Sequence, residues 1–230
     1  MGNIWAIFKK QCKDTFKNKT ILIQFVMFPV LTLIMNNVIT VDGMPDNFFV
    51  NLFATMYIGM APLTSMAAVI AEEKEKNTLR VLLMSNVKPY EYLLGVGSYI
   101  WLACMFGAAI ICAAGSYSPQ EGLAFMLIMV IGILASLLIG AAIGTWSKTQ
   151  MMATSITAPV MMVFSFMPML SMFNNTIAKV AKFIYSEQIS IMLNQISALQ
   201  IEVSNICIIA VNLLLFVTLF TIAYKRCGFE

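Results

Sequence analysis

The sequence contains no histidine and only five cysteines, no two of which form a C-x-x-C pair. It therefore offers almost nothing for a zinc, iron or redox site. Cys104, Cys112 and Cys207 lie inside long apolar runs, where packing as small hydrophobic side chains is the expected role. Cys12 and Cys227 stand beside lysines, and we expect no disulfide.

Charged residues are also scarce, at 11% of the 230 residues, whereas 60% are apolar. A soluble domain needs charged residues near a quarter of its chain, so the apolar surplus has to face lipid. Six stretches without Asp, Glu, Lys or Arg reach the roughly 20 residues that cross a bilayer as a helix. They are 21–40, 48–71, 92–115, 122–146, 151–173 and 205–224. We expect an all-α integral membrane protein, with one transmembrane domain over 1–230.

Lysine and arginine are distributed unequally between the segments that join these stretches. All but two of the 14, the exceptions being Lys179 and Lys182, lie on one side if the six stretches are spans. By the positive-inside rule this side is the cytoplasm, so both termini are expected there. This distribution indicates how the chain is oriented in the membrane rather than a surface that binds nucleic acid. The first span has no A-x-A site after it and is expected to stay uncleaved. We expect a multi-pass protein of a bacterial plasma membrane.

Two segments outside the spans have helical amphipathic patterns. Residues 1–19 place Trp5, Phe8 and Phe16 on one face and lysines on the other. This pattern predicts a helix in the cytoplasmic headgroup region, and a simple anchor for the first span is an equal alternative. Residues 174–204 predict two short helices that lie at, or dip into, the outer leaflet.

The segment 72–91 is much longer than a join between two spans requires. It begins with glutamates that suit a helix N-terminus: Glu72, Glu73 and Glu75. An apolar stripe follows at helical spacing: Leu79, Leu82 and Leu83. Pro89 suits the start of the next helix. The pattern predicts a short amphipathic helix that ends at Ser85-Asn86 and docks a partner, and a helix lying on the membrane surface is the alternative.

This segment resembles the cytoplasmic loop of the type-2 family of ATP-binding-cassette (ABC) transporter permeases, the drug and polysaccharide exporter kind. The family pattern is roughly E-x-E-x-G-T-L-x-x-L-x-x-[ST]-P-[VI], ending near G-[KR]. The matching residues are Glu73, Glu75, Thr78, Leu79, Leu82, Ser85, Val87 and Gly95. Asn77 replaces the glycine, Asn86 the proline and Val96 the basic residue. The order of the spans and the amphipathic segments extends the resemblance over nearly the whole chain.

The resemblance implies that the loop inserts into a groove on an ATPase subunit and transmits its closure. The implied coupling residues are Glu73, Glu75, Thr78, Leu79, Leu82, Leu83, Ser85, Asn86 and Val87. The implied partners are two ABC ATPase subunits and a second permease chain, identical or related. The chain has no G-x-x-x-x-G-K-[ST] phosphate loop. ATP and Mg are therefore expected on the ATPase, and this chain is expected to have no catalytic residue, metal or cofactor.

Three further patterns bear on packing and cargo. Ser136, Gly140 and Gly144 recur at four-residue spacing and allow helices to approach closely, and we favour packing within the chain over packing between chains. Pro62, Pro159 and Pro168 are able to kink or break their spans.

Many of the 19 methionines crowd the span 151–173. Packing explains them most simply, and a path for hydrophobic cargo is the alternative. The candidate path residues are Met161, Phe164, Met167 and Met169.

The function expected is ATP-driven export of a hydrophobic or amphipathic cargo, such as an antimicrobial or toxin peptide or a lipophilic drug. A gradient-driven carrier or channel is the alternative, but such proteins usually have ionisable residues inside the membrane, and these spans have none. A membrane-embedded protease is disfavoured, because Glu72-Glu73 lacks the later arginine and histidines of one such family.

Overall fold

The computed structural model describes residues 2–39, 45–196 and 202–227, and these form α-helices and no strand. The helices are α1 (Gly2–Lys17), α2 (Lys19–Val38), α3 (Phe48–Glu75), α4 (Thr78–Met84), α5 (Pro89–Ala114), α6 (Pro119–Trp146), α7 (Gln150–Phe173), α8 (Asn175–Ala181), α9 (Tyr185–Asn194) and α10 (Val203–Cys227). The all-α class expected from the composition is confirmed.

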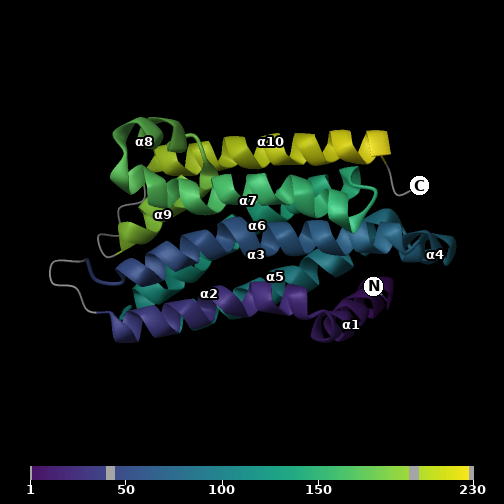
Figure 1. Ribbon diagram of the computed structural model, residues 1–230, viewed down its shortest axis with the longest axis horizontal. Coiled ribbons are helices and arrows are strands. Elements are labelled where there is room, and N and C mark those ends of the chain that lie inside the picture. Colours follow the sequence, from purple (N-terminus) through teal and green to yellow (C-terminus); the bar gives the residue numbers. More distant parts are fainter. Residues whose placement is uncertain (1, 40–44, 197–201, 228–230) are drawn as a thin grey trace.

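Six of these helices, α2, α3, α5, α6, α7 and α10, are long and apolar enough to cross a membrane, as predicted. In Figure 1 they run along the long axis of the molecule. Helix α3 is central. In its most apolar stretch of 18 residues 83% of the residues are buried, and the helix packs against α2, α5, α6, α7 and α9. In the corresponding stretches of α7 and of α10, only 17% of the residues are buried. These two helices therefore keep large apolar faces for lipid or another chain.

Helix α3 is longer than a bilayer requires. Its 28 residues extend over about 42 Å, against a hydrocarbon core of about 30 Å. The helix continues through Pro62, and α7 likewise continues through Pro159 and Pro168, so these prolines do not end either span. One consequence is that α3 projects beyond the membrane.

The two ends of the bundle carry different elements. Helix α1, helix α4, the connection between α6 and α7 and the end of α10 lie at one end, which we name the basic end (Figure 1). Helices α8 and α9 lie at the opposite end, which we name the far end. Lys179 and Lys182 follow α7 and belong to the far end, whereas the other lysines and arginines belong to the basic end. The bundle thus preserves the charge asymmetry of the sequence.

The far end contains the two short helices predicted within 174–204, and residues 197–201 of that segment lie outside the described residues. Helix α9 is built into the bundle, since Tyr185 and Ile189 have no exposed surface. The hydroxyl oxygen of Tyr185 lies 2.7 Å from that of Ser136 on α6. The side-chain amide of Asn51 on α3 donates to Oδ1 of Asn194 at 3.0 Å. Helix α9 therefore joins α3 and α6 at this end.

Small residues bring α3 and α6 into close contact. The Ser136 hydroxyl donates to the carbonyl oxygen of Ile58 at 2.6 Å. A Cβ atom placed on Gly140 would lie only 2.5 Å from the carbonyl oxygen of Leu63, and one on Gly144 would also collide with α3. These three small residues pack within the chain, which confirms the arrangement favoured from the sequence.

We predict that Gly140→Ala lowers the free energy of unfolding by about 1–3 kcal/mol, because the added methyl group forces α3 and α6 apart. The measurement is unfolding in mixed dodecyl maltoside and SDS micelles. Gly97→Ala is the matched control, since a Cβ there meets only Met66 Cε at 3.9 Å, and alanine is the better helix former. Equal stability of the two variants would contradict this account of the interface.

Candidate functional site

The last turn of α3 connects that helix to two others at the basic end. Lys74 Nζ donates to the carbonyl oxygen of Thr145, near the end of α6, at 2.6 Å. The Glu75 carboxylate accepts a hydrogen bond from the backbone N–H of Gln150, the first residue of α7, at 2.7 Å. Glu75 thereby satisfies a donor at the start of α7 that has no partner inside its own helix. The turn holds the α6–α7 connection in place.

The glutamates were expected to begin a helix, and this prediction is wrong, because Glu72, Glu73 and Glu75 form the C-terminal turn of α3. The first glutamate ends the apolar run of the sequence, but the backbone hydrogen bonds of α3 continue through all three glutamates. Negative charge at a helix C-terminus is unfavourable, so these carboxylates need donors. Glu72 accepts from Lys76 at 2.5 Å and from Asn18 Nδ2 at 3.4 Å. The hydrogen bond to Glu72 raises the pKa of Lys76.

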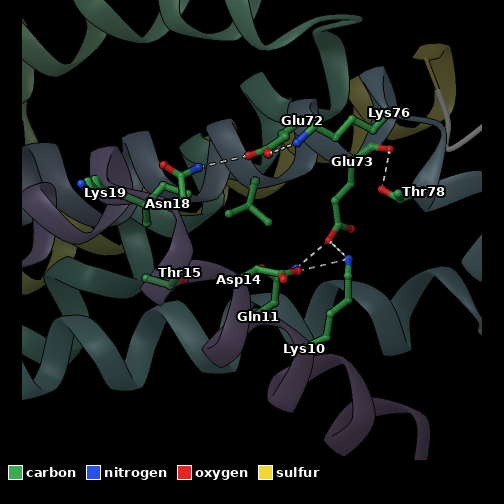
Figure 2. A pocket seen from close by; sticks show the side chains of 12 residues that line it. Lys10, Gln11, Asp14, Thr15, Asn18, Lys19, Glu72, Glu73, Lys76 and Thr78 are labelled. Atoms are coloured by element: carbon green, nitrogen blue, oxygen red, sulfur yellow. Dashed lines mark hydrogen bonds and ion pairs between the residues drawn. The ribbon is translucent and has the colours of Figure 1, made fainter.

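Glu73 is the buried member of this turn, with 6% of its surface exposed. Its Oε1 atom forms an ion pair with Lys10 and accepts from Gln11 Nε2 at 2.6 Å, both from α1 (Figure 2). The hydroxyl of Tyr92, buried on α5, also interacts electrostatically with this carboxylate. The Thr78 hydroxyl donates to the Glu73 carbonyl oxygen at 3.1 Å. A single carboxylate therefore joins α1 to α3 beside the start of α4.

A left-handed residue separates α3 from α4. Asn77 has φ 55° and ψ 11°, a conformation that glycine adopts freely and that asparagine tolerates better than most residues. This is the position at which the family pattern has glycine. Asparagine therefore preserves the turn, and the departure from the pattern has a conformational explanation. Asn86, after α4, also has a positive φ, of 67°.

Helix α4 buries a different set of side chains from the set expected. Leu79 is only 2% exposed and packs into the core of this chain, while Leu82 and Leu83 are half-buried. Leu79 is therefore not part of an exposed stripe in this chain, and Glu73 is buried as well; the coupling role implied for these two residues stays a prediction. Val81 and Met84, which the sequence analysis did not single out, are 65% and 80% exposed.

We name the exposed apolar pair Val81 and Met84 the α4 tip. The remaining implied coupling residues differ in exposure. Glu75, Ser85 and Asn86 are exposed, and Thr78 and Val87 are half-buried. Val81 and Met84 are three residues apart and so share one face of the helix. The spacing of Val81 and Met84 is visible in the sequence, but Leu79 and Leu82 have the same spacing, so the sequence alone does not distinguish the exposed pair from the more buried one.

A family model described as "ABC-2 family transporter protein" matches residues 6–225. The chain belongs to the ABC-2 transporter family. Search of the curated proteins gives no match. Membership makes the chain the membrane-spanning permease subunit of a transporter, a kind of subunit that associates with ATPase subunits. The basic end, with α4 projecting from it, is thus the candidate site of that association.

Helix α1 places its predicted aromatic residues in two environments. Trp5 and Phe16 are 58% and 73% exposed, as an interfacial helix requires. Phe8 instead packs on the bundle, with its ring 5.3 Å from that of Trp5 and 5.6 Å from that of Tyr99 on α5. Gln11 is buried as well. One face of α1 therefore binds the bundle in this permease, and the sequence analysis missed the role of Gln11 and Lys10 on it.

The candidate cargo residues on α7 are all half-buried: Met161, Phe164, Met167 and Met169. Phe164 packs inside the chain, with its ring 5.0 Å from Tyr185 and 6.0 Å from Phe216. The exposed apolar face of α7 carries other side chains, among them Met162 and Phe166. A role for the four residues in a cargo path stays a prediction.

At the far end, Glu187 on α9 is a largely buried acid with 9% exposure. The Ser171 hydroxyl at the end of α7 lies 2.8 Å and 2.9 Å from its two carboxylate oxygens. Burial raises the pKa of Glu187, and the hydrogen bond from Ser171 opposes that rise. This carboxylate links the last turn of the span α7 to α9.

We predict that Lys10→Met lowers the free energy of unfolding by about 3 kcal/mol, because it leaves the buried Glu73 carboxylate without its cation. Adding Glu73→Leu to this variant should recover much of the loss. Lys76→Met is the control, since Lys76 is largely exposed and surface pairs contribute about 1 kcal/mol or less. The free energy of unfolding of all three variants is measured in mixed micelles of dodecyl maltoside and SDS. Equal losses for Lys10→Met and Lys76→Met would contradict the role given to Glu73.

We predict that Glu187 makes the protein less stable as pH rises. Its folded-state pKa lies above the ordinary 4.5, so the folded protein holds this proton more tightly than the unfolded chain. The contribution of Glu187 to the free energy of unfolding is most favourable below pH 4.5, and it is lost as pH rises through the folded-state pKa. Glu187→Gln should reduce the difference in unfolding midpoint between pH 5 and pH 7.5. The exposed Glu202 at the same end provides a control, and an equal effect of Glu202→Gln would refute the assignment.

Proposed function

We propose that this permease belongs to an ATP-driven exporter and receives the motion of a separate ATPase through the α4 tip. The observation that carries the proposal is the combination of a tip with two exposed apolar side chains and a base held by buried Leu79 and Glu73. An exposed apolar pair is a suitable anchor for a pocket on a partner. A fixed base passes the partner's displacement on to α3 instead of absorbing it.

Helix α3 is the element that transmits this displacement. It is one unbroken helix from the basic end to the far end. A Cβ atom on Gly59 would lie 2.7 Å from backbone atoms of Phe164 and Ser165 on α7, so the two helices touch through their backbones. At the far end Asn51 binds Asn194 of α9. Movement of α4 would therefore reach α7 and the far-end helices through close contacts.

The basic end faces the cytoplasm in this proposal, with both termini on that side of a bacterial plasma membrane. The support is the excess of lysine and arginine at that end. The transporter contains two permease chains, identical or related, and two ATPase subunits that hold ATP and Mg. A hydrophobic or amphipathic cargo, such as an amphipathic peptide or a lipophilic drug, fits the apolar, uncharged spans.

We predict that Val81→Asp combined with Met84→Asp weakens ATPase binding at least tenfold. In the proposed complex these two apolar side chains are buried against the ATPase, and the variant replaces them with charged ones. The measurement is co-purification of the ATPase with the full-length permease, followed by ATPase activity in lipid vesicles. Val203→Asp is the control, since Val203 is 74% exposed at the far end. Leu79→Asp does not test docking, because Leu79 is buried within this chain. Wild-type binding by the double variant would refute the role of the α4 tip.

A further inference from the structure

A cavity of about 540 Å³, lined mostly by polar and charged residues, lies at the basic end between α1, the start of α2 and the end of α3. Figure 2 shows its lining, with α1 side chains on one side and the last turn of α3 on the other. Its volume lies in the range of small-molecule sites and far exceeds the roughly 30 Å³ of one water molecule. The space is therefore large enough for a polar headgroup.

The cavity lies where two spans leave the membrane. Lys19 begins α2, and Glu72 stands in the last turn of α3. The apolar lining residues, Ile21 and Val69, both belong to these spans. The other lining residues carry charges, amides or hydroxyls. The lining thus changes from apolar to polar along the membrane normal, as a phospholipid does between its acyl chains and its headgroup.

The formal charges of the lining balance. Three lysines and three carboxylates face the cavity: Lys10, Lys19, Lys76, Asp14, Glu72 and Glu73. Lys10 pairs with Glu73, and Lys76 pairs with Glu72. Asp14 lies 4.0 Å from Lys10, at the limit of an ion pair, and half of its side chain is exposed. Lys19 is exposed and has no carboxylate partner among the described residues. Lys19 is therefore the cation available to a ligand, and Asp14, which also acts electrostatically on Lys76, is the carboxylate of the lining with the longest ion pair.

We propose that this cavity binds the headgroup of a zwitterionic phospholipid with a primary ammonium, as in phosphatidylethanolamine. Lys19 binds the phosphate and Asp14 accepts hydrogen bonds from the ammonium group, both charge-assisted. The balanced charge disfavours an anionic lipid, which would leave one negative charge unpaired. The lining contains no aromatic side chain, so it lacks the faces that bind a quaternary ammonium such as choline.

The bound headgroup occupies the space across which Lys10, Gln11 and Asn18 reach the end of α3. The backbone of α1 packs mainly on α5, so its connection to α3 depends on these side chains. A lipid in the cavity adds a contact to both helices. The inference concerns lipid recognition by the free permease and is independent of ATPase docking.

The test is native mass spectrometry of the full-length permease in detergent, with short-chain phosphatidylethanolamine, phosphatidylcholine and phosphatidylglycerol added separately. We expect one phosphatidylethanolamine per chain, bound at least tenfold more tightly than the other two. Asp14→Asn combined with Lys19→Gln should weaken that binding about tenfold, since two charge-assisted hydrogen bonds are lost. Lys9→Gln is the control, because Lys9 lies over the Trp5 ring, outside the cavity.

Four results would overturn the proposal. Equal binding of the three lipids, or wild-type binding by the double variant, would remove the specificity argument. Displacement of the lipid by millimolar inorganic phosphate would identify a site for a free anion. The fourth result is absence of lipid binding together with weaker ATPase co-purification by the double variant, which would identify a protein docking site. Loss of ATPase docking in the α4 tip variant, with lipid binding intact, would support both proposals separately.

Discussion

The buried carboxylate of Glu73 constrains the whole basic end of this protein. A carboxylate removed from water is costly unless it is paired and hydrogen-bonded, and Lys10 and Gln11 supply those interactions from α1. That requirement fixes the position of α1 relative to α3, although the α1 backbone packs mainly on α5. The same residue supplies its carbonyl oxygen to Thr78, the first residue of α4. Glu73 therefore contacts both peripheral helices, α1 through its carboxylate and α4 through its backbone carbonyl oxygen.

The position of α3 depends in turn on residues that have almost no side chain. Gly140 and Gly144 of α6 and Gly59 of α3 lie where a Cβ atom would meet backbone or side-chain atoms at less than 3.0 Å. Lipid supplies little hydrophobic driving force between helices, so close backbone contact has to hold the bundle together. Such contact also restricts sliding between helices. A displacement at the basic end is thus expected to move α3 together with α6 and α7.

The sequence predicted the six spans because an uncharged apolar run of about 20 residues has few structural alternatives. It also indicated α4, through leucines at helical spacing and the resemblance to a known loop. It did not predict which face of α4 is buried, because Leu79, Val81 and Met84 are all apolar and only tertiary contacts distinguish them. The predicted span stops at Ala71, where the apolar run ends, whereas the helix continues to Glu75. The contact of Glu73 with Lys10 joins residues 63 positions apart, a separation on which local patterns carry no information.

The cavity beside Glu73 gives the basic end a property that a fully packed junction would lack. Where two helices interdigitate, their relative position is set by close packing and tolerates little change. Here α1 and the end of α3 are connected across an open space by the side chains of Lys10, Gln11 and Asn18, and such side chains have several rotamers of similar energy. The rigidity of the connection then depends on what fills the space. Because α4 begins three residues after the last turn of α3, a headgroup bound as proposed would lie close to the base of the α4 tip. If both proposals hold, a lipid bound in this cavity would act on the proposed coupling segment without any change in the spans.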